Sequence, residues 1–343
     1  MGPPTGVPKP VPRRANAQEP RLELLVKILV TGATGYIGSK LTPLLLEHGH
    51  DVRVLVRDRT NLPSADWVSS VEVVEADLTQ ESGLTRLLAG IDAVYYLVHG
   101  MKSGPGFHQR EKEMAEGLAK AASDMNIGRI IYLGALGNPS STLTEHLRSR
   151  HETGRLLAST GIPTIELRAG PVVGAGSLPF EMIRYLTERV PVMICPRWVY
   201  TRVQPIALHD TLSYLVSALQ VSAKGHEILE IGGGSVLSYG EMMTGYAKVR
   251  GLRRLMIRVP VLTPRLSSLW VHLITPLHSS LARPIVEGLR NEVIVRNHRA
   301  LEYFPKIAPS DYITSVGLAL SDLTPTSDNK DPLKRSYAEL QTV

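Results

Sequence analysis

The stretch VKILVTGATGYIG, residues 26–38, decides the fold of this chain. A short apolar run leads into a loop with three glycines, and a stretch with helical spacing of apolar residues follows. The spacing is GxxGxxG, in which Gly32 permits a tight turn, Gly35 admits a pyrophosphate and Gly38 allows close packing of helix and strand. We therefore expect a dinucleotide phosphate at the N-terminus of the helix, bound by Gly32, Thr34, Gly35, Tyr36, Ile37 and Gly38.

Strands and helices alternate along the chain from this loop to residue 170. Apolar and β-branched runs predict strands at 52–58, 71–78, 92–100, 129–137 and 163–170. Helical spacing lies between them, at 36–49, 83–89, 107–126 and 146–160. Such alternation builds βαβ units, and strands that are apolar throughout fit a sheet buried on both faces. We therefore predict an α/β fold, a doubly wound parallel Rossmann sheet, over residues 25–170.

The rest of the chain divides into a cap and two tails. Residues 171–320 alternate less regularly and predict a smaller C-terminal cap, partly interleaved with the core. Its expected elements are helices near 178–189, 209–220 and 239–250, a strand at 226–231 and an apolar stretch at 255–290. Residues 1–24 hold six prolines without an apolar period and are expected to be disordered. Residues 321–343 are expected to form a polar tail.

The amino-acid composition argues against several classes of function. The 343 residues are 43% hydrophobic and 20% charged, as in ordinary globular proteins. The single cysteine, Cys195, rules out a disulfide scaffold and suits a reducing compartment, so we expect a cytoplasmic protein. The net charge of +6 comes without a long Lys/Arg block, so we expect no nucleic-acid partner. The 11 histidines form no paired metal motif, so we expect no metal.

The end of the second strand bears on the choice of nucleotide. The apolar run VRVLV is followed by Arg57, Asp58 and Arg59. An arginine at this place suits the 2′-phosphate of NADP, whereas an acidic residue suits the ribose hydroxyl of NAD. We favour NADP(H) bound by Arg57, with NAD left possible because of Asp58. Both arginines could instead be solvated surface residues. Asp77 and Leu78 close the third strand, where a carboxylate could bind the adenine amine.

The motifs in order resemble a known superfamily. TGATGYIG, VRVLVRD, EADLTQ, AVYYLVHG, RIIYLGALG, ELRAGPVVGAGS and QPIALHD follow one another over residues 26–250. The chain resembles the atypical and extended short-chain dehydrogenase/reductases, in particular NmrA-like proteins and bacterial proteins called nucleoside-diphosphate-sugar epimerases. The resemblance implies a catalytic Ser, Tyr and Lys. At those positions this chain has Gly134 or Ala135, His146 and Arg150, so all three residue types are absent.

The lost residues leave several candidates for the chemistry. His146 stands at the tyrosine position and could act as a general acid, although an exposed histidine beside arginines is often only a surface residue. Arg150 could bind the nicotinamide ribose. Tyr96, Val98 and His99 end the fourth strand, at the sheet edge where ligands bind. Tyr96 and His99 are further proton donors, although one of Tyr95 and Tyr96 is expected to pack in the core. The resemblance places Pro171 along the nicotinamide.

Two functions from different classes remain open at this point. The first is an NADP(H)-dependent reductase of an apolar small molecule, with a pocket from apolar cap residues such as Leu178, Phe180 and Trp198. The second is a non-catalytic NADP(H)-sensing regulatory or assembly protein, NmrA-like. The stretch 261–283 carries an apolar stripe without the length of a membrane span, so it packs on the cap, lines a substrate tunnel or makes a peripheral membrane contact. The oligomeric state stays open.

Overall fold

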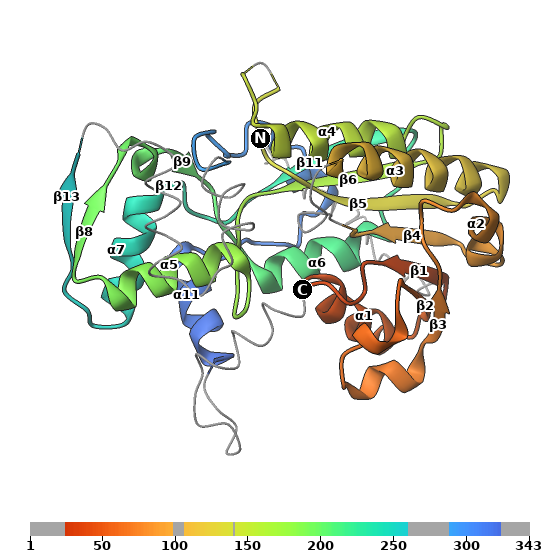
Figure 1. Cartoon of the computed structure of the whole chain (residues 1–343), viewed down its shortest axis with the longest axis horizontal. Helices are drawn as coiled ribbons and strands as arrows, with labels where there is room; N and C mark the ends of the chain where they lie inside the picture. The colour runs from red at the N-terminus through yellow and green to blue at the C-terminus, as the bar shows by residue number, and fades with distance from the viewer. Residues whose placement is uncertain (1–24, 99–105, 140, 260–287, 324–343) are drawn as a thin grey trace, which may run out of the picture.

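A seven-stranded parallel sheet forms the centre of the molecule in the computed structural model, which describes residues 25–98, 106–139, 141–259 and 288–323 (Figure 1). The order of the strands is β11-β6-β5-β4-β1-β2-β3, and every neighbouring pair is parallel. These strands are β1 (Lys27–Thr31), β2 (Asp51–Val56), β3 (Glu72–Glu75), β4 (Ala93–Tyr96), β5 (Arg129–Ala135), β6 (Thr164–Ala169) and β11 (His226–Ile231). The predicted doubly wound sheet is confirmed.

Helices cover both faces of this sheet. One face is covered by α1 (Gly38–Glu47) and α6 (Leu208–Ala218), and the other by α2 (Glu81–Leu88), α3 (Phe107–Asp124) and α4 (Glu145–Leu157) (Figure 1). Successive strand residues point to opposite faces, so Ile28 and Val30 pack under α1 while Leu29 packs against α2 and α3. Two buried apolar layers result, which explains why the strands are apolar throughout.

The chain order of the strands creates a topological switch point at β1. From β1 the chain moves outward to β2 and β3, then returns to the other side of β1 with β4. The loops that leave β1 and β4 therefore diverge at their carboxyl ends, which is where open α/β sheets bind ligands. The glycine loop, residues 32–37, leaves β1 at this place.

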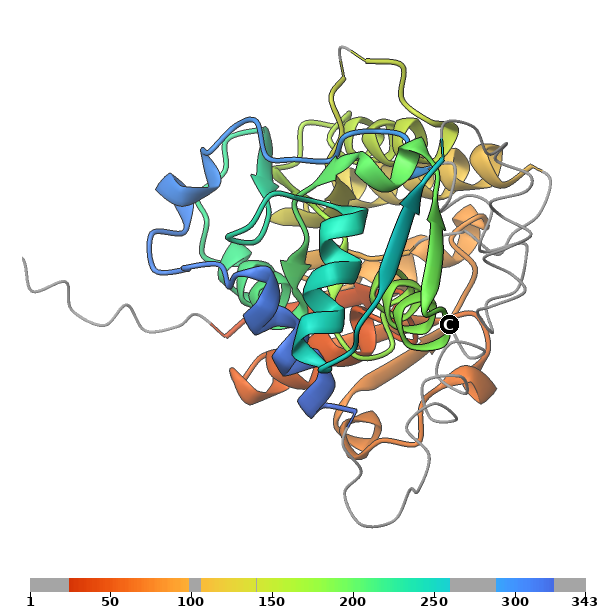
Figure 2. The same cartoon turned by 90° about the vertical axis from the view of Figure 1, so that its left-hand side faces the viewer.

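The cap is a separate apolar layer at one end of the molecule (Figures 1 and 2). Its buried residues come mainly from α5 (Leu178–Arg189), α7 (Tyr239–Val249) and α11 (Tyr312–Ser321), and β8 (Val192–Cys195) pairs in parallel with β13 (Leu255–Arg258) beside them. The smaller elements are β7 (Val172–Val173), β9 (Arg202–Val203), β10 (Ile206–Ala207), β12 (Leu237–Ser238), α10 (Ala300–Tyr303) and the 3-10 turns Arg59–Asn61, Asp66–Ser70 and Arg197–Tyr200.

Core and cap are interleaved more than a boundary at residue 170 suggests. Strand β11 pairs with β6 at the edge of the central sheet, and α6 packs beneath that sheet, although both lie in the region assigned to the cap. On α6, Asp210 accepts a hydrogen bond of 2.7 Å from the amide of Ser310, which ties this helix to the last described segment. The tail 1–24 and the stretch 261–283 lie outside the described residues, as does the C-terminal tail beyond residue 323.

Candidate active site

Backbone contacts in the glycine loop leave no room for a side chain at Gly32 or Gly38. Gly32 has a φ of +73°, and a Cβ there would lie 2.7 Å from the carbonyl oxygen of Leu97. A Cβ on Gly38 would overlap the carbonyl oxygen of Gly32 and lie 2.8 Å from Cα of Ala33. The amide of Gly35 closes the loop with a 2.9 Å hydrogen bond to Gly32. The loop thus brings the start of α1 against the ends of β1 and β4, where a pyrophosphate would meet backbone amides.

The remaining loop residues are half-buried and connect the loop to the cap side. Thr34, Tyr36 and Ile37 are each partly exposed. The amino group of Lys40 lies 5.4 Å from the centre of the Tyr36 ring. A Cβ on Gly174, just after β7, would lie 2.5 Å from the Tyr36 hydroxyl oxygen. Tyr36 therefore reaches from the nucleotide loop to the segment that follows β6, which borders the predicted nicotinamide end.

Arg57 differs from its two neighbours in the hydrogen bonds and ion pairs of its side chain. The carboxylate of Asp58 accepts hydrogen bonds from the hydroxyl and the amide of Thr60, at 2.6 and 2.8 Å, and these lower its pKa. Arg59 donates to the carbonyl oxygen of Val73 at 2.8 Å and lies 3.8 Å from the carboxylate of Glu75. Arg57 is exposed and makes no hydrogen bond or ion pair within the described residues. Asp58 uses only one carboxylate oxygen in these bonds, so of the two arginines Arg57 is the one available to a ligand.

Asp77 and Leu78 follow the third strand, and Asp77 stabilises a turn. Asp77 accepts hydrogen bonds from the amide and the hydroxyl of Thr79, both at 2.9 Å, through a single carboxylate oxygen. Leu78 is buried in the layer between the sheet and α2 and α3. Asp77 thus retains its second oxygen for a nucleotide, whereas Leu78 can offer only its backbone.

At the end of β4, both tyrosines are core residues on opposite faces of the sheet. Tyr95 donates to the carbonyl oxygen of Leu215 at 2.8 Å, under α6. Tyr96 packs edge-on against Tyr132, with ring centres 6.0 Å apart, and burial raises its pKa well above the ordinary range. This placement favours packing over proton donation for Tyr96. Val98 is half-buried, and a Cβ on Gly32 would lie 3.1 Å from its amide nitrogen. His99 lies outside the described residues.

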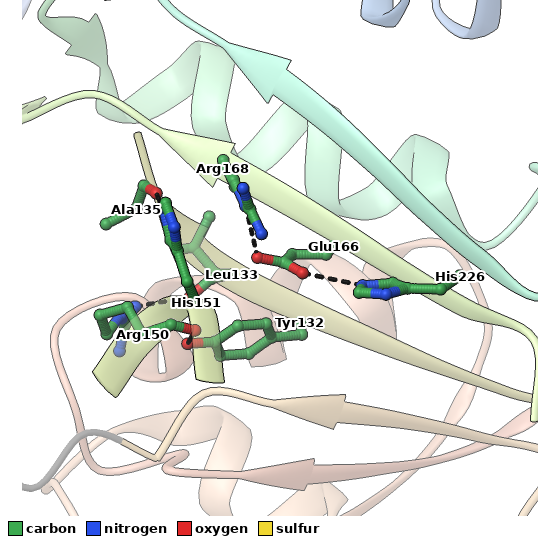
Figure 3. A network of polar contacts seen from close by, with 8 residues as sticks. All are labelled: Tyr132, Leu133, Ala135, Arg150, His151, Glu166, Arg168 and His226. Carbon is green, nitrogen blue, oxygen red and sulfur yellow. Dashed lines mark hydrogen bonds and ion pairs between the residues drawn. The ribbon is translucent and has the colours of Figure 1, made fainter. Parts of the chain in front are cut away.

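Helix α4 carries the two residues that replace the family's tyrosine and lysine. His146 is half-buried in the first turn. One turn later, Arg150 donates to the carbonyl oxygen of Leu133 at 2.5 Å, and its guanidinium lies 5.5 Å from the centre of the Tyr132 ring (Figure 3). The Tyr132 hydroxyl donates back to the carbonyl oxygen of Arg150 at 3.0 Å. Arg150 is therefore held against β5, next to the strand end where the serine of the family would stand.

A buried ionic group lies beside these residues and is not evident from the sequence (Figure 3). Glu166 on β6 is fully buried and accepts hydrogen bonds from Arg168 at 2.6 Å and from His226 at 2.8 Å. Burial by itself raises the pKa of Glu166, but the bonds from His226 and Arg168 outweigh it and leave that pKa below the ordinary value. The sequence signal was only a Glu and an Arg two residues apart in an apolar strand.

Helix α4 packs directly on this carboxylate. A Cβ on Gly154 would overlap Oε2 of Glu166 and lie 2.8 Å from its Oε1. From the same helix, His151 donates through Nε2 to the carbonyl oxygen of Ala135 at 3.0 Å (Figure 3). Burial and the nearby Arg168 lower the pKa of His151, which favours the neutral ring. Gly134, at the serine position, lies against the same carboxylate, because its Cβ would be 3.2 Å from Oε1.

The segment after β6 leads from the sheet into the cap. The carbonyl oxygen of Pro171 accepts a hydrogen bond of 3.0 Å from the amide of Ile206, and β7 pairs with β10. Pro171 is half-buried. Its backbone is thus fixed beside the carboxyl end of β6.

The described residues contain neither a cluster of metal ligands nor a membrane-spanning helix. No group of three or more His, Cys, Asp or Glu side chains in that part of the chain could hold a metal ion. No helix formed by the described residues is long and apolar enough to cross a membrane.

Comparisons with protein sequences agree with this geometry. Residues 32–161, from the glycine loop to the end of α4, match the model of the NAD(P)H-binding family. A ceramide reductase of Caulobacter vibrioides is 27% identical over 237 residues, which cover 68% of this chain and 73% of that protein. The photosystem II assembly factor Ycf39 of Cyanophora paradoxa is 29% identical over 140 residues, 40% of this chain and 43% of that protein.

Solved structures share the whole fold at low identity. A nucleoside-diphosphate-sugar epimerase of Staphylococcus aureus has a TM-score of 0.66 at 18% identity, over 84% of this chain and 99% of that one. A quinone oxidoreductase of Escherichia coli, complexed with NADPH, has a TM-score of 0.67 at 17% identity, over 84% of this chain and 98% of that one. Residues 32–161, with the glycine loop at the switch point of the sheet, thus match an NAD(P)H-binding domain, and the chain shares its fold with these solved structures.

Proposed function

We propose that this protein is an NADP(H)-dependent reductase of an apolar small molecule. The observation that carries the proposal is the guanidinium of Arg57, which forms no hydrogen bond or ion pair with the described residues and lies at the end of β2, one strand away from the glycine loop. Arg59 is engaged on β3, and one carboxylate oxygen of Asp58 is engaged in a turn. A guanidinium left open at this place matches a phosphate with paired hydrogen bonds.

The described residues fit a dinucleotide along the carboxyl edge of the sheet. The loop from Gly32 to Gly38 would hold the pyrophosphate and Arg57 the 2′-phosphate. Asp77 would bind the adenine amine, and Arg150 would hold the nicotinamide ribose. When bound, NADPH supplies the hydride for reduction of a carbonyl or an enone.

The protein must supply the proton that completes such a reduction. His146 is half-buried at the first turn of α4, on the same helix as Arg150, and an imidazole titrates near neutral pH. It occupies the place of the family's tyrosine. Tyr96 is less suited because it is buried and its pKa is raised. We assign the proton transfer to His146.

An apolar substrate is supported by the surroundings of the site. The cap core continues without a break into the site, since Leu136 after β5 and Leu147 on α4 belong to the same apolar cluster as Val173 and Phe180. Two relatives point in the same direction, because one is a ceramide reductase and one is a quinone oxidoreductase. A long-chain ketone or a quinone is therefore the class of substrate that we propose.

The proposal is tested first on the nucleotide. Replacing Arg57 by alanine removes a charge-assisted bond, worth about 1.5–3 kcal/mol, so NADPH binding should weaken roughly tenfold or more. NADH binding should change little. Arg59→Ala is the matched control, since this arginine is tied to β3 and should leave both affinities unchanged. Equal losses for NADPH and NADH in Arg57→Ala, measured by calorimetry, would refute the assignment.

The second test is turnover with the wild-type protein. NADPH oxidation is followed spectroscopically with a panel of long-chain ketones, enones and quinones. Turnover with at least one apolar member is expected. If NADPH binds tightly but no member is reduced, the non-catalytic alternative becomes the better explanation. That alternative rests on Gly134, His146 and Arg150 in place of the family's catalytic residues and on the similarity to an assembly factor.

A further inference from the structure

The small sheet at the far end of the cap exposes an apolar face. Strands β8 and β13 pair in register, with Val192 opposite Leu255 and Ile194 opposite Ile257. These four side chains, the β8–β13 face, are between 45% and 58% exposed. The alternate residues Met193 and Cys195 turn inward and are buried in the cap core. The sheet is therefore anchored on one side and presents four large apolar side chains to solvent on the other, which is unusual for a surface without a partner.

The segments that form this sheet are strongly basic. Residues 189–202 and 248–259 contain eight arginines and lysines and no aspartate or glutamate. Arg197 and Arg253 are exposed and make no side-chain hydrogen bond or ion pair among the residues that the structure describes. Arg258 alternates with Ile257, so it lies on the other side of the sheet with Met256, over the ring of Tyr200 at 3.9 Å. Arg250 and Arg202 pair with Glu188 and Glu292 outside these segments, at 3.4 and 3.6 Å, so the charge left for a partner near the apolar face is that of Arg197 and Arg253.

The position of this face leaves the nucleotide site accessible. Strands β8 and β13 form one end of the molecule, whereas β1, β2 and α1 lie at the other side of it (Figure 1). Viewed from that end, β8 and β13 lie next to each other beside α7 (Figure 2). A flat partner that covered the β8–β13 face would therefore not cover the glycine loop or Arg57.

We propose that the β8–β13 face docks on an anionic lipid bilayer. An apolar patch flanked by arginines is the combination that binds a membrane surface without spanning it, because burial of the side chains adds to attraction by acidic headgroups. A protein partner would need acidic side chains placed to match scattered arginines, whereas an anionic bilayer is complementary over its whole surface. The proposal does not depend on catalysis, although it would bring the cap to the place where apolar molecules dissolve.

The test is cosedimentation of the full chain with vesicles. We expect binding to phosphatidylcholine vesicles that contain phosphatidylglycerol, weak binding to pure phosphatidylcholine, and weakening by salt because salt screens exposed charges. The double variant Ile194→Thr/Ile257→Thr should lower the partition coefficient roughly tenfold or more, as should Arg197→Gln/Arg253→Gln. Ile313→Thr is the matched control, because Ile313 on α11 is 45% exposed, like Ile257, and it should bind as the wild type does.

Each alternative occupant gives a different result. If the wild type does not bind anionic vesicles, the proposal is wrong. If it does not bind them but forms a dimer that Ile194→Thr/Ile257→Thr dissociates in sedimentation velocity, the face is an interface between two copies. If vesicle binding survives both double variants but is lost in Leu269→Ser/Leu273→Ser, the contact lies in residues 261–283 instead. Unchanged NADPH affinity and melting temperature in each variant show that the fold is intact.

Discussion

At the scale of single residues, the site combines a well-defined nucleotide loop with altered chemistry. Gly32 and Gly38 are fixed by backbone contacts, and Arg57, at the end of the neighbouring strand, has no bonded partner among the described residues. In contrast, the positions that carry the reaction in the superfamily hold His146, Arg150 and Gly134. Binding and catalysis can therefore be separated by mutation more cleanly than in a site where one residue serves both.

His146→Ala should lower turnover by roughly 100-fold or more, the usual scale for loss of a general acid. NADPH affinity should stay nearly unchanged, since the expected cofactor contacts lie on the loop, on Arg57 and on Arg150. His209→Ala is the matched control, because the side chain of His209 is 80% exposed on α6. The measurement is single-turnover NADPH oxidation. Full turnover in His146→Ala would place the proton donor elsewhere.

Gly38→Ala should abolish nucleotide binding. The new methyl group would overlap the carbonyl oxygen of Gly32 and lie 2.8 Å from Cα of Ala33, and both are backbone atoms that cannot rotate away. Gly83→Ala in α2 is the control, because its Cβ would meet only the Cβ of Ala76 at 3.8 Å, an ordinary contact. Fluorescence titration with NADPH compares the two. Retained binding in Gly38→Ala would mean that the loop is not the pyrophosphate site.

At the scale of elements, the docking of α4 on β6 depends on one glycine. Gly154→Ala would place a methyl group that overlaps Oε2 of the buried Glu166 and lies 2.8 Å from its Oε1, and the helix would have to move. Overpacking of this kind costs about 1–3 kcal/mol. Gly317→Ala in α11 meets nothing within 4 Å and should stabilise the protein slightly, because alanine favours helix. Urea unfolding should therefore shift in opposite directions for the two glycines.

The bonds of the buried Glu166 to Arg168 and to His226 on β11 make the unfolding free energy of the protein depend on pH in the acid range. The pKa of Glu166 is lowered in the folded protein by His226 and Arg168, against the effect of burial. Its contribution is therefore complete above its unfolded pKa of about 4.3 and is lost as the pH falls through the lower folded value. In Glu166→Gln that contribution is absent at every pH, so the difference in unfolding free energy from the wild type should shrink between neutral and acid pH. Glu47→Gln, an exposed change on α1, should show no such trend.

The elements themselves were largely predictable, and the reason is burial. All seven strands of the central sheet were expected within a few residues, because both faces are covered and the runs are apolar. The pairing of β8 with β13 was not predicted, because these strands have four residues each and lie about sixty residues apart in the chain. The group of Glu166, Arg168 and His226 was missed for the same reason, because only the pairing of β6 with β11 brings it together.

At the scale of the whole molecule, core and cap are expected to unfold together. Strand β11 belongs to the central sheet, and Asp210 on α6 bonds to the amide of Ser310. A ligand that binds only the folded protein stabilises all of it, by about 2.7 kcal/mol at a hundredfold excess over Kd. NADPH should therefore raise the melting temperature in one cooperative transition, and NADH should raise it less. Gly38→Ala should show no shift in differential scanning calorimetry.

The contact between Gly154 and Glu166 also constrains how this sequence can change over time. A larger residue at position 154 destabilises the protein as long as a side chain of the length of glutamate fills position 166, whereas a shorter side chain at position 166 does not require the glycine to change first. The two positions are thus epistatic in one direction, and substitutions at them are expected in a fixed order. Among homologues, a side chain of the length of glutamate at position 166 should be accompanied by glycine at position 154, while glycine should also occur with shorter side chains at position 166.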